Sequence, residues 1–210
     1  MSAVADLVKK QPRCLVISDE VYEHLVYDGK KHVSPASLPG MWERTITVGS
    51  AGKSFSCTGW KIGWAVGPAH LVQPIASANQ WVPFCVSTPA QEAVARMLAL
   101  AKQPYQGFAT YYDWLRDFFT RKRDALVQVL DKAGLQPIVP EGGYFVMADT
   151  SRIQVPASYL AAPDTTRDYA LCRWLTAEVG VSPIPPSAFY VRENKHLAQN
   201  YARFAFCKKD

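Results

Sequence analysis

The chain has 210 residues, of which 49% are hydrophobic and 20% are charged, a balance typical of globular proteins with a real core. Its net charge of +5 favours anionic ligands, but the basic residues are scattered, which argues against nucleic acid as a partner. No apolar run is long enough for a membrane span, and the first residues lack the pattern of a signal peptide. The five cysteines form no CxxC pair, so we expect reduced thiols of an intracellular protein and no metal site.

The first half of the sequence predicts strands that alternate with helices. Residues 2–10 predict a helix that Pro12 ends, and the apolar run CLVI predicts a buried strand over residues 13–18. Turn signals indicate a loop over residues 28–43. Two further strands and two helices are then predicted, over residues 43–50, 60–68, 69–81 and 88–102.

The second half predicts a long helix followed by a small unit of mixed structure. The helix covers residues 108–133 and ends at Gly134; two short strands (136–140 and 142–149), a helix (166–179) that ends at Gly180 and a last strand (202–206) follow. The pattern predicts an α/β fold, with a largely parallel sheet over residues 1–104 and a long helix with a small α+β domain over 105–210. The boundary is expected near residues 103–108, in a Pro-Tyr-Gln-Gly stretch.

Lys53 stands in the stretch TVGSAGKSFSCTGWKIGW, at residues 47–64. Its neighbours Ser50, Ala51, Gly52 and Ser54 are small, which leaves room for a bulky group against the backbone. A lysine in a loop is most often a solvated cation. In a pocket, however, desolvation lowers the pKa of a lysine, and the neutral amine can form a Schiff base with a carbonyl. The cofactor that uses such a lysine is pyridoxal phosphate.

This cofactor makes two further demands, for which the sequence offers residues. Its pyridine nitrogen needs an anionic partner, and Asp19 follows a predicted buried strand at its carboxyl end, where ligands bind in open α/β sheets. Its phosphate needs hydroxyls and cations, and Ser50 and Lys61 bracket Lys53. Tyr22 is placed to reach the ring hydroxyl. Plainer explanations stay open: a helix cap for Asp19, packing for Tyr22 and an exposed strand position for Lys61.

Several segments resemble the fold-type I, class I aminotransferases. ISDEVYEHLVYDG and SAGKSFSCTGWKIGWAVGP carry this resemblance, while SLPGMWERTITVGSAGKSFSCTGWKIGW, EGGYFVMAD and YARFAFCKK resemble the group of kynurenine aminotransferase, glutamine transaminase K and cysteine-conjugate β-lyase. The resemblance implies the large domain of a pyridoxal-phosphate transferase and transamination between an L-amino acid (kynurenine, glutamine, aromatic or sulfur amino acids) and a 2-oxo acid. It further implies a homodimer in the cytoplasm or in mitochondria.

The resemblance also implies a role for each matching residue. Lys53 matches the Schiff-base lysine that moves the proton at the substrate Cα, Asp19 the partner of the pyridine nitrogen, Tyr22 the partner of the ring oxygen, Ser50 and Lys61 the phosphate ligands, and Arg203 the arginine that binds the substrate α-carboxylate. Without the resemblance, Arg203 would be interpreted as a surface ion pair on an edge strand. Class I enzymes commonly have arginine at the position of Lys61, whereas the kynurenine aminotransferase group tends to have lysine there.

The family pattern continues beyond both ends of this chain. We therefore expect a C-terminal portion of an aminotransferase that binds its cofactor weakly, that leaves sheet edges and an apolar face open, and that aggregates or needs a partner. Two alternatives remain at this point. One is a cysteine-conjugate β-lyase, which shares the same Cα carbanion and performs C–S elimination, and the other is a fragment without catalytic activity.

Overall fold

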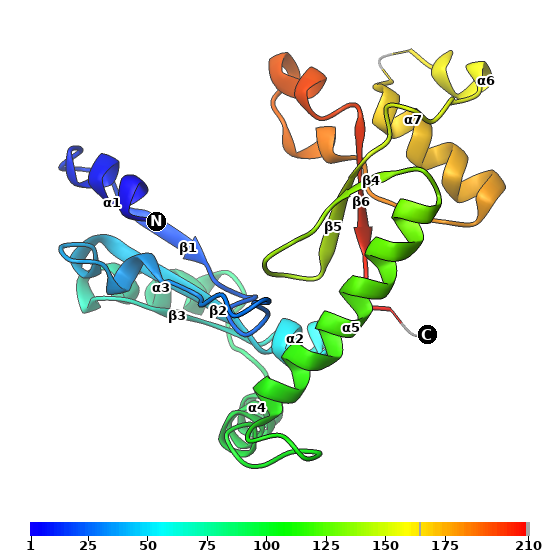
Figure 1. The fold of residues 1–210 in the computed structure, drawn as a ribbon. Coiled ribbons are helices and arrows are strands. Elements are labelled where there is room, and N and C mark those ends of the chain that lie inside the picture. Colours follow the sequence, from blue (N-terminus) through cyan, green and yellow to red (C-terminus); the bar gives the residue numbers. More distant parts are fainter. Residues whose placement is uncertain (164, 209–210) are drawn as a thin grey trace. The chain divides into compact units, whose positions relative to one another are not determined.

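The computed structural model describes residues 1–163 and 165–208, and the chain divides into two compact units, Met1–Leu115 and Arg116–Asp210 (Figure 1). The division lies inside the long helix α5 (Tyr111–Lys132), whereas the sequence placed a domain boundary earlier, near residues 103–108. Each unit has a sheet of its own and is described by itself. Within the described residues, no helix combines the length and the apolar character that a membrane crossing requires.

The first unit contains three strands and four complete helices, which are β1 (Val16–Asp19), β2 (Thr45–Ser50), β3 (Gly63–Val66), α1 (Ser2–Lys9), α2 (Ala51–Ser54), α3 (Ala69–Trp81) and α4 (Thr88–Leu100). The predicted strands and helices of this half are confirmed, with ends that shift by a few residues. Pro89 stands in the first turn of α4, where its missing N–H costs no helical hydrogen bond. The sequence did not predict α2, because a single helical turn carries no apolar periodicity.

The sheet of the first unit is mixed rather than largely parallel. β2 lies in the middle, parallel to β1 and antiparallel to β3. The prediction that β1 is buried is wrong for this unit, because Ile17 exposes 73% of its surface. The apolar run predicts that other segments pack against both faces of the strand. In this unit the face of β1 that carries Ile17 is exposed instead. β1 is also at the edge of the described sheet.

A small apolar core lies beneath α2. The buried residues Ala51, Ile62 and Val94 form it, and Phe55 and Trp64 pack against it. Burial of large apolar side chains contributes about 1.5–3 kcal/mol for each of them. The short helix is therefore fixed to β3 and α4 through its own first residue.

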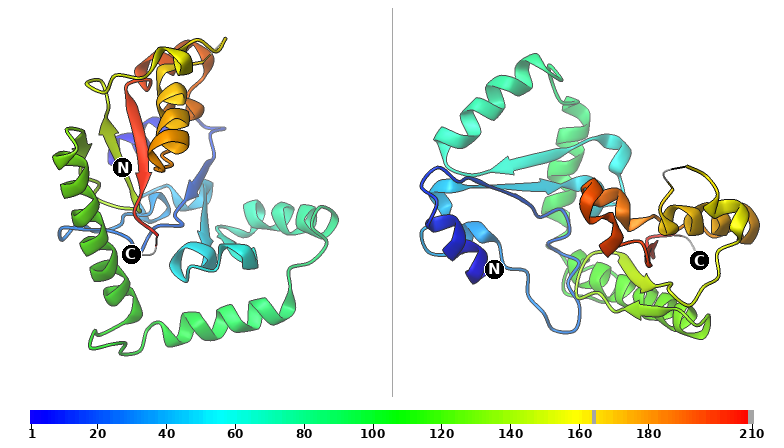
Figure 2. Two further views of the ribbon diagram at one scale, coloured as in Figure 1. Left: turned by 90° about the vertical axis from the view of Figure 1, so that its right-hand side faces the viewer. Right: turned by 90° about the horizontal axis from the view of Figure 1, so that it is seen from above.

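The second unit contains an antiparallel sheet and two short helices, which are β4 (Gln136–Ile138), β5 (Phe145–Asp149), β6 (Tyr201–Ala205), α6 (Ala157–Leu160) and α7 (Arg167–Trp174). β5 lies between β4 and β6, and α7 packs against β6 (Figures 1 and 2). A π-helical turn, Leu175–Val179, continues α7. The helix ends predicted at Gly134 and Gly180 are confirmed, and both glycines have the positive φ (79° and 80°) of a helix C′ position.

The two faces of this second sheet differ. Val146, Ala148 and Ala202 are fully buried on one face, as alternation along β5 and β6 requires. Phe145 and Arg203 belong to the opposite face, which is only partly buried. The sheet therefore presents Arg203 on its open side.

Candidate functional site

The strand register places Asp19 and Ser50 on one face of the first sheet. Asp19 pairs with Val48, and Ser50 stands two residues further along β2, so the three side chains point to the same side. Ser50 pairs in turn with Gly63, which adds no side chain to this face. Because β1 and β2 are parallel, Asp19 and Ser50 both lie at carboxyl ends of strands, where open α/β sheets bind ligands.

The helical turn α2 carries Lys53 directly after β2. Ser50 caps this turn, since its Oγ accepts a hydrogen bond from the backbone N–H of Gly52 at 3.1 Å. Ala51, the residue after Ser50, donates its N–H to the carbonyl of Ile62, the residue after Lys61, at 3.1 Å. The backbone segments that carry Ser50 and Lys61 are therefore neighbours.

Lys61 itself is not a strand residue, because β3 begins only at Gly63. It closes the 3₁₀ turn Thr58–Trp60 in the left-handed conformation, with φ of 56°, and it is exposed. A residue other than glycine in this region costs roughly 1 kcal/mol. The explanation of Lys61 as an exposed strand position is therefore wrong.

Thr58 and Tyr111, which no sequence motif indicates, hold the Lys53 turn in place. Thr58 Oγ1 donates to the carbonyl of Gly52 at 3.1 Å, and the Tyr111 hydroxyl donates to the carbonyl of Ser54 at 2.9 Å. Burial raises the pKa of Tyr111 to about 12, so the phenol stays protonated and remains a donor. No local pattern could have identified Tyr111, since it is far from Lys53 in the sequence.

The small size of Gly52 has a structural cause. A Cβ atom there would lie 2.9 Å from the Cα of Thr58, so the close approach of these two backbone segments needs glycine. The prediction that small residues around Lys53 leave room for a ligand therefore does not apply to Gly52. It stays open for Ser50, which is half-buried.

Tyr22 and Lys53 approach each other from different segments. Lys53 Nζ lies 6.0 Å from the centroid of the Tyr22 ring, and Tyr22 belongs to the turn that follows β1.

The carboxylate of Asp19 accepts one long hydrogen bond in the described part of the chain, from the N–H of Val21 at 3.4 Å, and it keeps acceptor capacity for a cation. No helix begins after Asp19, so the helix-cap explanation is wrong.

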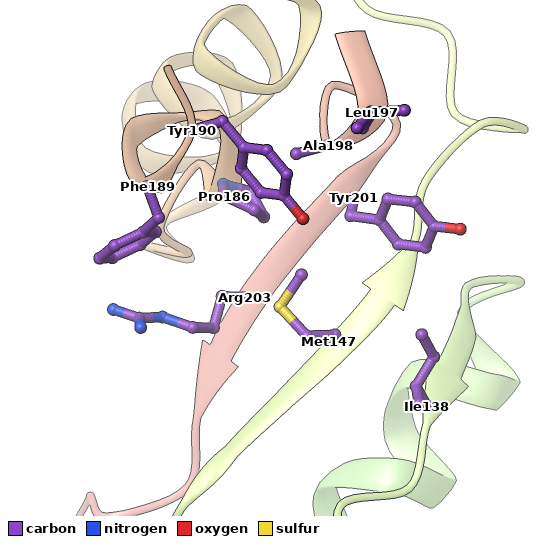
Figure 3. A pocket seen from close by; sticks show the side chains of 9 residues that line it. All are labelled: Ile138, Met147, Pro186, Phe189, Tyr190, Leu197, Ala198, Tyr201 and Arg203. Atoms are coloured by element: carbon purple, nitrogen blue, oxygen red, sulfur yellow. The ribbon is translucent and has the colours of Figure 1, made fainter. Parts of the chain in front are cut away.

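Arg203, in the second unit, lies on β6, an edge strand of the described sheet, but its backbone is paired on both sides. β6 pairs with β5 on one side, and on the other side the backbone of Arg203 exchanges hydrogen bonds of 2.9 and 3.0 Å with Ile184. Its guanidinium borders a cavity of about 360 Å³, which Figure 3 shows. No carboxylate among the described residues pairs with it, and its buried Nε has no hydrogen-bond partner. The surface ion pair considered for Arg203 is therefore also wrong.

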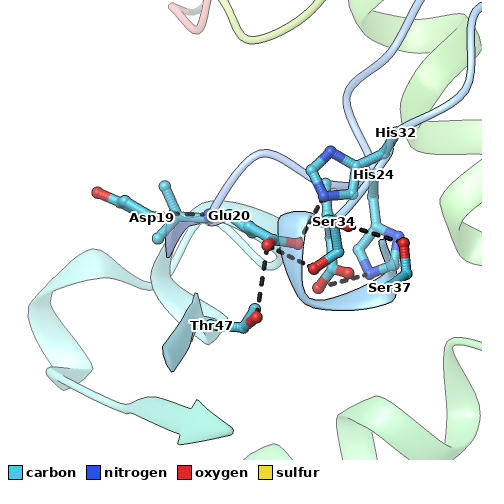
Figure 4. Close-up of polar contacts among 9 residues, drawn as sticks. Asp19, Glu20, His24, His32, Ser34, Ser37 and Thr47 are labelled. Atoms are coloured by element: carbon cyan, nitrogen blue, oxygen red, sulfur yellow. Dashed lines mark hydrogen bonds and ion pairs between the residues drawn. The ribbon is translucent and has the colours of Figure 1, made fainter. Parts of the chain in front are cut away.

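Glu20 directly follows Asp19 and forms a separate polar network (Figure 4). Only 5% of its surface is exposed, and its carboxylate lies 2.6 Å from His32 Nε2 and accepts from Ser34 Oγ at 2.7 Å and from Thr47 Oγ1 at 3.4 Å. Burial acts to raise the pKa of Glu20, but hydrogen bonds, chiefly from His32 and Ser34, together lower it below its usual 4.5. No local sequence pattern indicates this network, because its members are far apart in the chain.

The network predicts a pH dependence of stability. A carboxylate whose pKa is lower in the folded than in the unfolded state adds stability above its unfolded pKa, and this is lost as pH falls through the folded pKa. We expect denaturant unfolding of the chain to show a loss of stability as the pH falls below the usual glutamate pKa of 4.5, and this loss should be smaller in Glu20→Gln. The exposed Glu43→Gln variant should behave as the original chain. Equal pH profiles for Glu20→Gln and the original chain would contradict the prediction.

Comparisons with known proteins identify relatives of this chain. The family model for aminotransferase class I and II matches residues 1–209. The kynurenine–oxoglutarate transaminase of Dictyostelium discoideum is 47% identical over 100% of this chain and 49% of its own length. Human kynurenine–oxoglutarate transaminase 3 is 43% identical over 100% of this chain and 46% of its own length.

Solved structures show the same fold. Bna3p of Saccharomyces cerevisiae matches 100% of this chain and 49% of its own with a TM-score of 0.89 at 36% identity. N-succinyldiaminopimelate aminotransferase of Mycobacterium tuberculosis matches 99% of this chain and 49% of its own with a TM-score of 0.81 at 37% identity. The chain thus spans about half the length of these relatives, and the predicted α/β fold class is confirmed. Because the family model matches residues 1–209, this chain belongs to the class I and II aminotransferases.

Proposed function

We propose that this chain carries the cofactor lysine and the substrate arginine of an enzyme that transfers an amino group between an L-amino acid and a 2-oxo acid. The observation that carries the proposal is the arrangement at the carboxyl ends of β1 and β2, where the Lys53 amine, the Tyr22 ring and the Asp19 carboxylate come from adjacent segments. An amine, a phenol and a carboxylate in this order suit pyridoxal phosphate better than a metal or a nucleotide.

The residues present fit this cofactor. When bound, pyridoxal phosphate supplies an electron sink that stabilises negative charge at the substrate Cα. Lys53 provides the amine that holds the cofactor covalently, and the same amine moves the proton at the substrate Cα. Asp19 keeps a proton on the pyridine nitrogen, because a carboxylate stabilises a neighbouring cation. Tyr22 donates to the ring oxygen, and Ser50 and Lys61 bind the phosphate.

Arg203 is suited to bind the α-carboxylate that amino acids and 2-oxo acids share. Its guanidinium has in-plane donors, and it has no carboxylate partner within the described residues. The relatives named as kynurenine–oxoglutarate transaminases support kynurenine as amino donor and 2-oxoglutarate as acceptor. We include glutamine, aromatic and sulfur amino acids as further donors, as the sequence resemblance implies. We include in the proposal that the enzyme is a homodimer.

Covalent labelling of the full chain tests the proposal. Pyridoxal phosphate is added, the adduct is reduced with borohydride, and peptides are mapped by mass spectrometry. We expect the modification at Lys53, with Lys61 as the internal control because it is more exposed but proposed to bind only phosphate. Modification spread evenly over exposed lysines, or an unmodified Lys53, would mean that the Lys53 turn does not bind the cofactor.

A further inference from the structure

Two aromatic rings from different elements flank the Arg203 guanidinium. Its Cζ lies 4.2 Å from the centroid of the Phe145 ring and 4.6 Å from that of the Phe189 ring. Phe145 shares the open face of the sheet, since it stands two residues before Met147, the partner of Arg203 in β5. Phe189 comes from the 3₁₀ turn Pro186–Phe189, and Figure 3 shows its ring beside the guanidinium.

Core packing does not explain the position of Phe189. The side chain is 64% exposed, which is unusual for a phenylalanine, and yet its ring contacts the cation. A guanidinium is attracted to ring faces and is more weakly hydrated than an ammonium. Contact with a ring does not use the N–H groups of a guanidinium as a hydrogen bond would, and the buried Nε of Arg203 has no hydrogen-bond partner among the described residues. The rings therefore hold the guanidinium without engaging its N–H groups in hydrogen bonds.

The turn that carries Phe189 is itself fixed to the start of α7. Asp168 is fully buried, and its carboxylate accepts hydrogen bonds from the Ser187 N–H at 2.8 Å and from the Ser187 hydroxyl at 2.9 Å. The Thr166 hydroxyl donates to the same carboxylate at 2.5 Å. A buried carboxylate with these partners stabilises one conformation of the turn. The exposed ring of Phe189 is thus carried by a rigid base.

We propose that Phe189, supported by Asp168 and Ser187, is a positioning residue that holds the Arg203 guanidinium ready for a substrate carboxylate. The inference rests on the proposed function, in which Arg203 binds the α-carboxylate. A flexible arginine loses side-chain entropy when it binds a ligand, and a guanidinium already held by a ring loses less. Phe189 therefore raises carboxylate affinity without touching the carboxylate.

Nuclear magnetic resonance of the full chain with ¹⁵N-labelled arginine tests this inference without the cofactor. The Arg203 Nε–H signal is assigned by its absence from Arg203→Gln, and the affinity for pyruvate, the carboxylate probe, is measured for every variant by isothermal titration calorimetry. Phe189→Leu should shift this signal, because a ring current is lost, and should weaken pyruvate binding about threefold to tenfold. Phe189→Tyr keeps a ring and should keep both properties.

A matched control comes from a second aromatic–cation pair of the same unit. Phe118 lies 5.1 Å from Lys122 Nζ on α5, so Phe118→Leu makes the same chemical change away from Arg203 and should alter neither the signal nor the affinity. If Arg203→Gln weakens pyruvate binding and Phe189→Leu does not, the positioning role is wrong and the carboxylate role stands. If Arg203→Gln leaves pyruvate binding unchanged, both roles are wrong.

Discussion

Replacing Lys53 with alanine is expected to abolish covalent attachment of pyridoxal phosphate and to lower transamination by at least about a thousandfold. The variant loses the amine that binds the cofactor and the base that moves the Cα proton, and no second lysine stands in the α2 turn to replace it. Lys53 is on a turn that hydrogen bonds from Thr58 and Tyr111 fix, so the backbone should keep its conformation. Attachment is measured by the visible absorbance that pyridoxal phosphate acquires on binding to the chain.

Two further variants separate the causes of this loss. Lys53→Arg keeps the positive charge but has no amine that can react, and it should fail as Lys53→Ala does. Lys61→Ala removes a phosphate ligand and should weaken cofactor affinity about tenfold while attachment at Lys53 persists. If Lys53→Ala still acquired the absorbance of the original chain, another group would hold the cofactor and the proposed site would be wrong.

The sequence predicts those parts of the site that depend on the order of strands and turns. Asp19 and Lys53 each follow an apolar or β-branched run, and because β1 and β2 are parallel, both come to the same end of the sheet. The helix ends at Gly134 and Gly180 are also local, since each needs one residue with positive φ. Such features are encoded within a few neighbouring residues, so a local sequence pattern is enough to predict them.

The parts that the sequence does not predict depend on contacts between distant residues. The hydrogen bond from Tyr111 to Ser54 and the network around Glu20 join segments with no shared pattern. The exposure of Ile17 could not be predicted for the same reason. An apolar run indicates that a strand packs against other segments on both faces, but it does not indicate which segments these are. The support of Phe189 by Asp168 likewise joins the start of α7 to a 3₁₀ turn, two segments that look unrelated in the sequence.

Replacing Asp19 with asparagine is expected to remove the proton from the pyridine nitrogen of the bound cofactor and to lower turnover on the order of a hundredfold to a thousandfold. The amide has nearly the same shape but no charge, so the partner of the nitrogen is lost while β1 and its pairing with β2 remain. A neutral ring withdraws electrons less strongly and stabilises less charge at the substrate Cα. The ¹⁵N chemical shift of pyridoxal phosphate labelled at its ring nitrogen reports the protonation state directly.

The neighbouring carboxylate provides the control for this experiment. Glu20 follows Asp19 but is committed to His32 and Ser34, so Glu20→Gln should leave the ring nitrogen protonated even where it changes stability. Asp19→Glu keeps the charge at a longer reach and should retain part of the protonation. An unchanged ¹⁵N shift in Asp19→Asn would contradict the assignment of Asp19. An equal change in Glu20→Gln would contradict it as well, because the effect would then not depend on which of the two adjacent carboxylates is lost.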